Sequence, residues 1–146
     1  MIRDMVKEDK AAFMEMADIF YSSAAVTHKV ERNIYEATFD AAVGGTPYLR
    51  ALIVEDEGAA VGFALLSFSF ATEMGGLAVL LEDLYISETC RGKGLGSEFM
   101  RFMEREYASA KRFRLEVTKE NAKAIELYRR LGYSVLEYVQ MVKEQV

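Results

Sequence analysis

The chain has 146 residues and a net charge of −5, with 51% hydrophobic and 28% charged residues. This composition belongs to a globular protein and excludes a disordered or fibrous one, and the length fits one domain over residues 1–146. Cys90 and His28 are the single cysteine and the single histidine. They exclude a disulfide framework and a zinc site of His and Cys ligands, so we expect no metal. Without a signal segment or an apolar run of roughly 18 residues, we expect a cytoplasmic protein that has no membrane partner.

The charges are unevenly distributed along the chain. Residues 1–90 contain 6 basic and 15 acidic side chains, a net −9, whereas residues 91–114 contain 7 basic and 3 acidic side chains, a net +4. An acidic majority argues against nucleic acid as a partner, because phosphate backbones require a basic footprint. The basic segment indicates a small phosphorylated ligand or, equally well on charge alone, a solvated helix face.

Hydrophobic spacing and turn residues predict the elements in chain order. They are a helix capped by Asp9 that runs to Tyr21, a helix over 30–43, strands over 48–55, 60–70 and 77–86, a glycine-rich loop over 87–96, a helix over 97–110, a strand over 113–117, a helix over 118–131 and a strand over 133–143. A hairpin and meander followed by a β-α-β-α-β order predicts a mixed sheet with helices on its faces. This is an α/β or mixed α+β fold.

The sequence Arg-Gly-Lys-Gly-Leu-Gly-Ser at 91–97 lies between a predicted strand and a predicted helix. Glycines allow positive φ, so successive N–H groups can converge on anionic oxygens, and the helix N-terminus adds its positive dipole end. Arg91 and Lys93 add fixed charge. We interpret the loop as a phosphate cradle in preference to a plain strand–helix turn.

Two other phosphate motifs fit this loop less well. A P-loop requires Gly-x-x-x-x-Gly-Lys-Ser/Thr, and that spacing is missing. The dinucleotide fingerprint nearly fits Gly92, Gly94 and Ser97, with Glu116 at the end of the next strand. In that fingerprint, however, the first glycine directly follows the strand, whereas here residues 87–91 intervene.

Three motifs in order resemble the GNAT superfamily of acyl-CoA N-acetyltransferases: Arg-x-x-Gly-x-Gly at 91–96, Leu-Leu-Glu-Asp-Leu-Tyr-Ile at 80–86, and Asn121 to Tyr128 followed by Gly132-Tyr133. The strand motif is also similar to the polyamine- and thialysine-acetylating branch. The resemblance covers about residues 80–133. It implies a GNAT-like fold, with a mixed, mostly antiparallel sheet of six to seven strands and about four helices. The CoA pyrophosphate would bind between the fourth strand and the third helix.

The resemblance also implies a set of residues that bind acetyl-CoA. The backbone of Leu84, Tyr85 and Ile86 would contact the pantetheine arm and polarise the thioester carbonyl, because donors aimed at developing charge lower the barrier. The pyrophosphate would be held by Arg91, Gly92, Lys93, Gly94, Leu95, Gly96 and Ser97. Asn121 would hold the pantetheine or the acetyl end.

Tyr128 corresponds to the family's general acid, which protonates the departing thiolate; a phenol of pKa about 10 keeps its proton at neutral pH. We favour Glu82 as the base, acting through water, and Asp83 or neither carboxylate are the alternatives. Period-2 geometry is expected to place Glu82 and Asp83 on opposite faces of their strand, and burying either without a function is costly. We interpret Cys90 and His28 as bystanders, not as a nucleophile and its base.

The predicted function is acetyl-CoA-dependent transfer of an acetyl group to a primary amine of a small, cationic acceptor, such as a polyamine or a lysine-like amine. The net −9 of residues 1–90 favours cations. A protein N-terminal or lysine acetyltransferase, and a non-catalytic CoA-binding sensor, are the alternatives. After Tyr133 only residues 134–146 remain. This tail would form a tight hairpin or one long strand completed by a partner chain, so we expect a homodimer.

Overall fold

The computed structural model describes residues 1–145, and in these residues the chain forms five strands and four α-helices. In chain order they are β1 (Ile2–Asp4), α1 (Lys10–Tyr21), α2 (Arg32–Val43), β2 (Leu49–Asp56), β3 (Ala59–Ala71), β4 (Gly76–Ile86), α3 (Leu95–Glu106), β5 (Arg112–Leu115) and α4 (Ala122–Arg130). Single 3₁₀ turns lie at Lys7–Asp9 and Glu88–Cys90.

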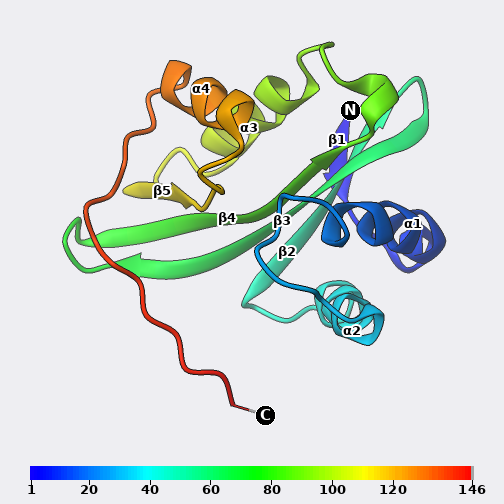
Figure 1. Cartoon of the computed structure of the whole chain (residues 1–146), viewed down its shortest axis with the longest axis horizontal. Helices are drawn as coiled ribbons and strands as arrows, with labels where there is room; N and C mark the ends of the chain where they lie inside the picture. The colour runs from blue at the N-terminus through cyan, green and yellow to red at the C-terminus, as the bar shows by residue number, and fades with distance from the viewer. Residues whose placement is uncertain (146) are drawn as a thin grey trace.

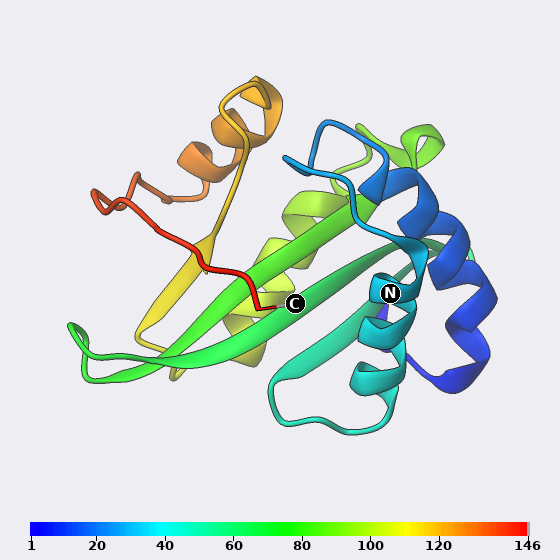
Figure 2. The same cartoon turned by 60° about the horizontal axis from the view of Figure 1, so that its bottom comes forward.

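The strands form one mixed sheet in the order β1-β2-β3-β4-β5. The pairs from β1 to β4 are antiparallel, and β5 alone runs parallel to its neighbour β4. Helices α1 and α2 cover one face of the sheet, and α3 and α4 lie on the other (Figures 1 and 2). This arrangement is the mixed α/β architecture that the order of elements predicts.

Each face of the sheet has its own hydrophobic cluster. Under α1 and α2, the ring centroid of Phe13 lies 5.5 Å from that of Phe39 and 5.0 Å from that of Phe63. On the other face, Phe99 and Met103 of α3 are fully buried against the sheet. Burial on both sides fixes the path of the central strands.

The helix boundaries differ slightly from those predicted, for identifiable reasons. α1 begins directly after Asp9, but the Asp9 carboxylate accepts hydrogen bonds from the Val6 amide and the Arg3 guanidinium, not from the first turn of the helix. α3 begins at Leu95 because Gly94 caps it with a φ of 81°. Asn121 accepts a hydrogen bond from the Ala124 amide and so starts α4 at Ala122, later than expected. β1 was not predicted, since three residues are too few to show a period.

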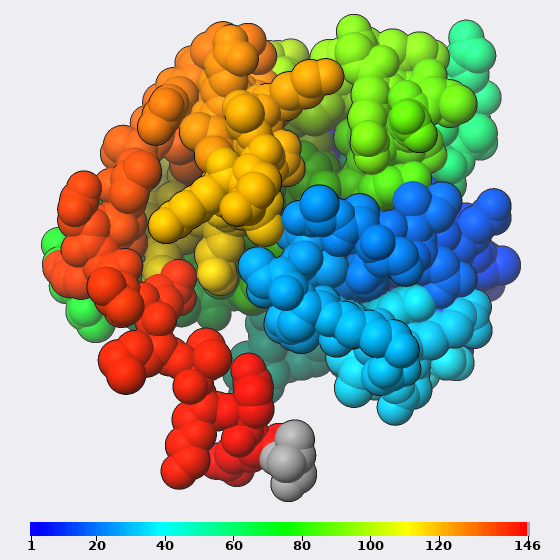
Figure 3. All heavy atoms as spheres, in the orientation of Figure 1, coloured from blue at the N-terminus to red at the C-terminus, as the bar shows by residue number. Residues whose placement is uncertain are grey.

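The prediction of six to seven strands is wrong: residues 1–145 contain five, and 133–143 is not a strand. The tail passes the β3–β4 hairpin (Figure 1) and projects away from the rest of the molecule (Figure 3). Tyr138 Oη donates to Glu73 Oε2 at 2.6 Å, but the side chains beyond are exposed, with Val139 at 91%. In residues 133–145 no segment pairs with the sheet, and a strand is stable only with a neighbour.

None of the helices in the described part of the chain combines the length and the apolar character that a membrane crossing requires.

Candidate active site

The separation of β4 from β5 creates a small cavity. Their parallel pairing ends at Leu81 and Leu115, while β4 continues to Ile86 and stays paired with β3 on its other side. Beyond Leu81 the free edge of β4 therefore faces a cavity of about 70 Å³. Leu84, Asn121 and Tyr128 line it together with the end of α1 and the segment that joins β5 to α4.

A β-bulge in β4 places two carboxylates on the same face of the sheet. Leu65 of β3 lies opposite Asp83, but Leu66 lies opposite Leu81, so Glu82 is the extra residue. Such an insertion interrupts the alternation of side chains. The expectation that Glu82 and Asp83 point to opposite faces is therefore wrong: both lie on the face that α1 and α2 cover in part.

Glu82 lies on the open part of this face and is exposed to solvent. The Ser67 hydroxyl donates a hydrogen bond to its Oε1 at 2.7 Å, and Ser67 belongs to β3, on the same face as Leu65. Glu82 also lines the small cavity. An ordered carboxylate that solvent can reach is suited to remove a proton through water.

Asp83 is half-buried, and the Tyr21 hydroxyl at the end of α1 donates to its Oδ2 at 2.6 Å. Burial raises the pKa of Asp83, the hydrogen bond from Tyr21 opposes that rise, and the charge of Glu82 adds to it. Burial, together with Asp83, also raises the pKa of Tyr21. A half-buried carboxylate with a raised pKa beside a cavity is a common mark of a functional site.

The sequence predicts Tyr21 only as the last residue of a helix, and its contact with Asp83 was missed. An acidic residue inside an apolar strand and a tyrosine at a helix end were the available signals.

Tyr128 and Asn121 bring α4 into the site. The Tyr128 ring centroid lies 6.0 Å from that of Tyr133, and burial raises the pKa of Tyr128, so its hydroxyl is protonated at neutral pH. The Asn121 Oδ1 accepts from the Ala124 amide at 3.3 Å, which leaves the side-chain NH₂ as a donor for another group. The structure thus gathers Glu82, Leu84, Asn121 and Tyr128 from the predicted set around one cavity.

The glycine loop follows the end of β4 and leads directly into α3. Gly92 and Gly94 both have a φ of 81°, and a Cβ added to either would meet no atom of the described residues within 4 Å. Gly96 and Ser97 lie in the first turn of α3, which begins at Leu95. The positive φ expected of the loop is confirmed, and open space lies above its backbone.

The two basic side chains of the loop have partners within the protein. Arg91 Nε donates to the carbonyl oxygen of Ile86 at 3.0 Å, and Lys93 Nζ lies 3.0 Å from Asp56 Oδ2. Both charges stay beside the loop. The basic segment does not form one patch, since Arg112 pairs with Glu73 at the β3–β4 turn.

The structure also shows the surroundings of Tyr85, Cys90 and His28. The Tyr85 ring packs against Phe63 with centroids 5.7 Å apart, so only its backbone is available at the β4 edge. Cys90 packs against the cluster on the α3 face, whereas His28 lies exposed in the segment between α1 and α2. In residues 1–145, no three His, Cys, Asp or Glu side chains form a group that could hold a metal ion.

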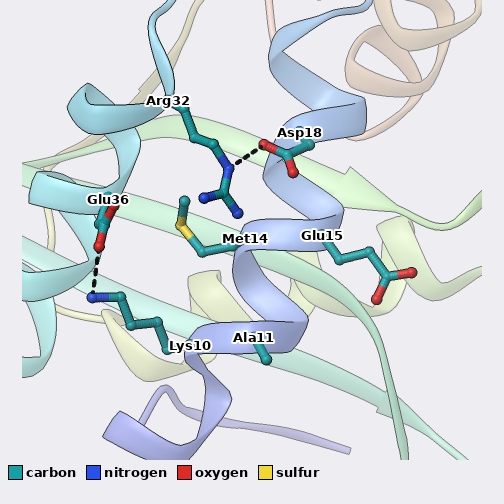
Figure 4. A pocket seen from close by; sticks show the side chains of 7 residues that line it. All are labelled: Lys10, Ala11, Met14, Glu15, Asp18, Arg32 and Glu36. Atoms are coloured by element: carbon teal, nitrogen blue, oxygen red, sulfur yellow. Dashed lines mark hydrogen bonds and ion pairs between the residues drawn. The ribbon is translucent and has the colours of Figure 1, made fainter.

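A larger cavity, of about 540 Å³, lies between α1 and α2 and is lined by charged residues (Figure 4). Four of these charges are paired: Lys10 Nζ lies 3.0 Å from Glu36 Oε1, and Arg32 Nε lies 3.3 Å from Asp18 Oδ1. None of the predicted site residues lines this cavity. The smaller cavity at the β4–β5 separation is therefore the candidate active site.

Comparison with known proteins shows the family of this chain. The model of the acetyltransferase (GNAT) family matches residues 11–133. Thialysine N-epsilon-acetyltransferase of Mus musculus is 30% identical over 142 residues, which cover 90% of this chain and 82% of that enzyme. The Bos taurus enzyme is 34% identical over 100 residues, covering 61% of this chain. That match spans 58% of the bovine enzyme's length.

Solved structures share the fold at low sequence identity. The aminoglycoside acetyltransferase AAC(6')-Iy, solved with a CoA-containing bisubstrate analogue, superposes with a TM-score of 0.80 at 16% identity. The superposition covers 100% of this chain and 98% of that one.

We predict that Asp83→Asn stabilises the protein at pH 7 but not at pH 4. Because its pKa is raised by burial, ionised Asp83 lowers stability above its folded pKa. The penalty is lost as the pH falls through about 3.9, because below that pH the carboxyl becomes protonated in both the folded and the unfolded state. The asparagine keeps an oxygen that can accept from the Tyr21 hydroxyl, so the unfolding temperature at pH 7 should rise by about 2–4 °C.

The control for this experiment is Asp40→Asn, an exposed carboxylate of α2 that pairs with Lys10. It should show no gain at pH 7. If Asp83→Asn is less stable than the wild type at pH 7 and matches it at pH 4, the burial argument for Asp83 is wrong.

Proposed function

The chain belongs to the GNAT family of acetyltransferases, and on that premise we propose that it transfers the acetyl group of acetyl-CoA directly to a primary amine of a small, cationic acceptor. The separation of β4 from β5 beside the glycine loop is the observation that carries this proposal. This separation leaves the edge of β4 free to bind the pantetheine arm of acetyl-CoA, and Tyr128 and Glu82 line the same cavity. We also propose that residues 1–146 form one domain.

The residues present fit acetyl-CoA along its length. Backbone groups of Leu84, Tyr85 and Ile86 would bind the pantetheine arm at the free edge of β4. The open space above Gly92 and Gly94 would admit the pyrophosphate, which the N-terminus of α3 would stabilise. The contacts proposed for this end are the residues of the loop, namely Arg91, Gly92, Lys93, Gly94, Leu95, Gly96 and Ser97. The Asn121 NH₂ would donate to the pantetheine or the acetyl end.

Acetyl-CoA supplies an activated thioester, and the protein supplies positions for the protons. Glu82 accepts one proton of the acceptor ammonium through water, which frees the nitrogen lone pair to form the C–N bond while the C–S bond breaks. Backbone N–H groups of β4 stabilise the negative charge that develops on the carbonyl oxygen. Tyr128 donates its proton to the departing sulfur, and the proton that the nitrogen loses on becoming an amide restores the phenol.

The acceptor class rests on charge and on the curated relatives. Residues 1–90 carry a net −9, and they include α1, α2 and both carboxylates of β4. A field of this sign attracts ammonium groups. The mammalian relatives are named for thialysine, a lysine-like amine, which supports an acceptor of that kind. A protein N-terminus or a protein lysine is the competing acceptor, and a CoA sensor without turnover is the competing class.

A homodimer is part of the proposal. The tail after α4 exposes Val135, Tyr138, Val139, Met141 and Val142, and β5 is paired on its β4 side only within residues 1–145. A second copy would bury these side chains, and sedimentation equilibrium at several concentrations measures whether the chain is a dimer. The proposed cytoplasmic location rests on the single cysteine, which fits a reducing compartment.

The acceptor proposal predicts a ranking of amines and a salt dependence. With acetyl-CoA and free-thiol release as the readout, kcat/KM for spermidine and thialysine should exceed that for a neutral arylamine. Added salt should lower only the cationic values, because it screens the steering field. A preference for the neutral amine, or rates that salt leaves unchanged, would show that the electrostatic argument is wrong.

Glu82→Gln should lower turnover near neutral pH, and raising the pH should restore part of it, since the amine then loses its own proton.

We predict that Tyr128→Phe lowers turnover by roughly 10²–10⁴-fold, the range for a general acid, while folding and CoA affinity persist. The matched control is Tyr133→Phe, at the ring next to Tyr128. It removes a buried hydroxyl that has no hydrogen-bond partner among the described residues. It should turn over at nearly the wild-type rate. Single-turnover kinetics separates chemistry from product release. Equal chemical rates for Tyr128→Phe and the wild type would remove Tyr128 as the acid.

A further inference from the structure

The Tyr21 ring is held in place from two directions. Its centroid lies 4.9 Å from that of Tyr35 in a stacked arrangement with an interplanar angle of 21°. The Phe20 ring meets it edge-on at 5.0 Å. Neither contact involves the Tyr21 hydroxyl, which donates to Asp83 Oδ2. The orientation of this hydroxyl is therefore set by packing between α1 and α2.

Tyr35 is in turn fixed by polar contacts on α1 and α2. It is buried, and its hydroxyl donates a hydrogen bond to Asp18 of α1. Asp18 also accepts from Arg32 Nε at 3.3 Å, at the rim of the larger cavity (Figure 4). Two helices thus cooperate to hold one phenol against a single carboxylate of β4.

The hydrogen bond from Tyr21 occupies one oxygen of Asp83. A carboxylate has two oxygens with about four lone-pair positions, so Oδ1 keeps its capacity to accept. Asp83 lines the small cavity together with Glu82 and Tyr128. An ammonium group that enters this cavity can meet Asp83 on the side that Tyr21 leaves free.

We propose that Tyr21 is a positioning residue for the acceptor: its hydroxyl fixes the Asp83 carboxylate so that Oδ1 receives the acceptor's ammonium group. The inference rests on the proposed function and extends it to a residue outside the family motifs. Burial disfavours an ionised Asp83, and the hydrogen bond from Tyr21 compensates for part of that penalty. Tyr21 therefore helps Asp83 to remain an anion where the acceptor binds.

Several titratable groups surround Asp83, and the test has to separate them. Tyr21 approaches from α1, and Glu82 is its neighbour on β4. Glu116, from the segment after β5, and Tyr128 of α4 line the same cavity. Only the Tyr21 hydroxyl is removed in Tyr21→Phe, so a difference between this variant and the wild type isolates its effect on Asp83.

The experiment compares Tyr21→Phe with Tyr35→Phe, which removes the hydroxyl of the stacked ring and leaves the contact with Asp83 intact. In Tyr21→Phe, the KM for a cationic acceptor should rise about tenfold, because a hydrogen bond to a charged group is lost. The acidic limb of the pH profile of kcat/KM should move upward by about one pH unit. Turnover at saturating acceptor above that limb should stay near wild type. Tyr35→Phe keeps the buried ring that stacks on Tyr21 and loses only the hydrogen bond to Asp18, so it should show neither change.

Two readouts make the result independent of a general loss of activity. A carbon-13 NMR titration of the Asp83 carboxyl measures its pKa directly, and this pKa should rise in Tyr21→Phe but not in Tyr35→Phe. In an Asp83→Asn background, Tyr21→Phe should have little further effect on KM, because the two residues act as one unit.

If the Asp83 pKa and the acceptor KM are the same in Tyr21→Phe and Tyr35→Phe, the inference is wrong. If the wild type acetylates no amine, the proposed function fails first. The NMR titration then still reports whether Tyr21 controls Asp83.

Discussion

The early end of the pairing between β4 and β5 is the constraint on which the site depends. Beyond the Leu81–Leu115 pair, β4 is hydrogen-bonded on one side only, so the backbone of its last residues has unused donors and acceptors. Such groups require a partner, which can be water or a ligand. The strand that leaves them open also carries the carboxylates and ends at the glycine loop. The separation of β4 from β5 therefore places the backbone donors, the general acid, the two carboxylates and the anion-binding loop along one continuous path.

The bulge at Glu82 assigns different environments to adjacent carboxylates. Glu82 remains in contact with solvent and Ser67, whereas Asp83 is half-buried against Tyr21. Two neighbouring acids with separated environments can perform separate roles, since burial and hydrogen bonding shift their proton affinities differently. In the proposed reaction, Glu82 removes a proton through water and Asp83 receives the ammonium. Without the bulge, alternation would direct one of them toward the hydrophobic cluster under α3.

Local features of the sequence predicted much of this architecture. The mixed sheet, the helix pairs and the left-handed glycines at 92 and 94 follow from periodicity and from residue types that act within a few positions. The bulge could not be predicted, because it is a property of the register between β3 and β4. Tyr21 was missed as a partner of Asp83 because 62 residues separate them and only tertiary packing joins them. The strand expected after Gly132 failed for a similar reason, since a strand requires a neighbour that the segment itself does not supply.

The most direct test of the account is the thermal shift that CoA produces in Gly94→Asp. Binding to the native state alone raises the unfolding temperature, so wild-type protein should shift with CoA. Gly94→Asp places a carboxylate in the open space above the loop and should abolish the shift. The control is Gly45→Asp, which has a similar φ of 85° and open surroundings after α2, and so carries the same backbone strain away from the loop. A CoA shift is expected in the wild type and in Gly45→Asp only; an undiminished shift in Gly94→Asp would contradict the assignment of the loop as the pyrophosphate site.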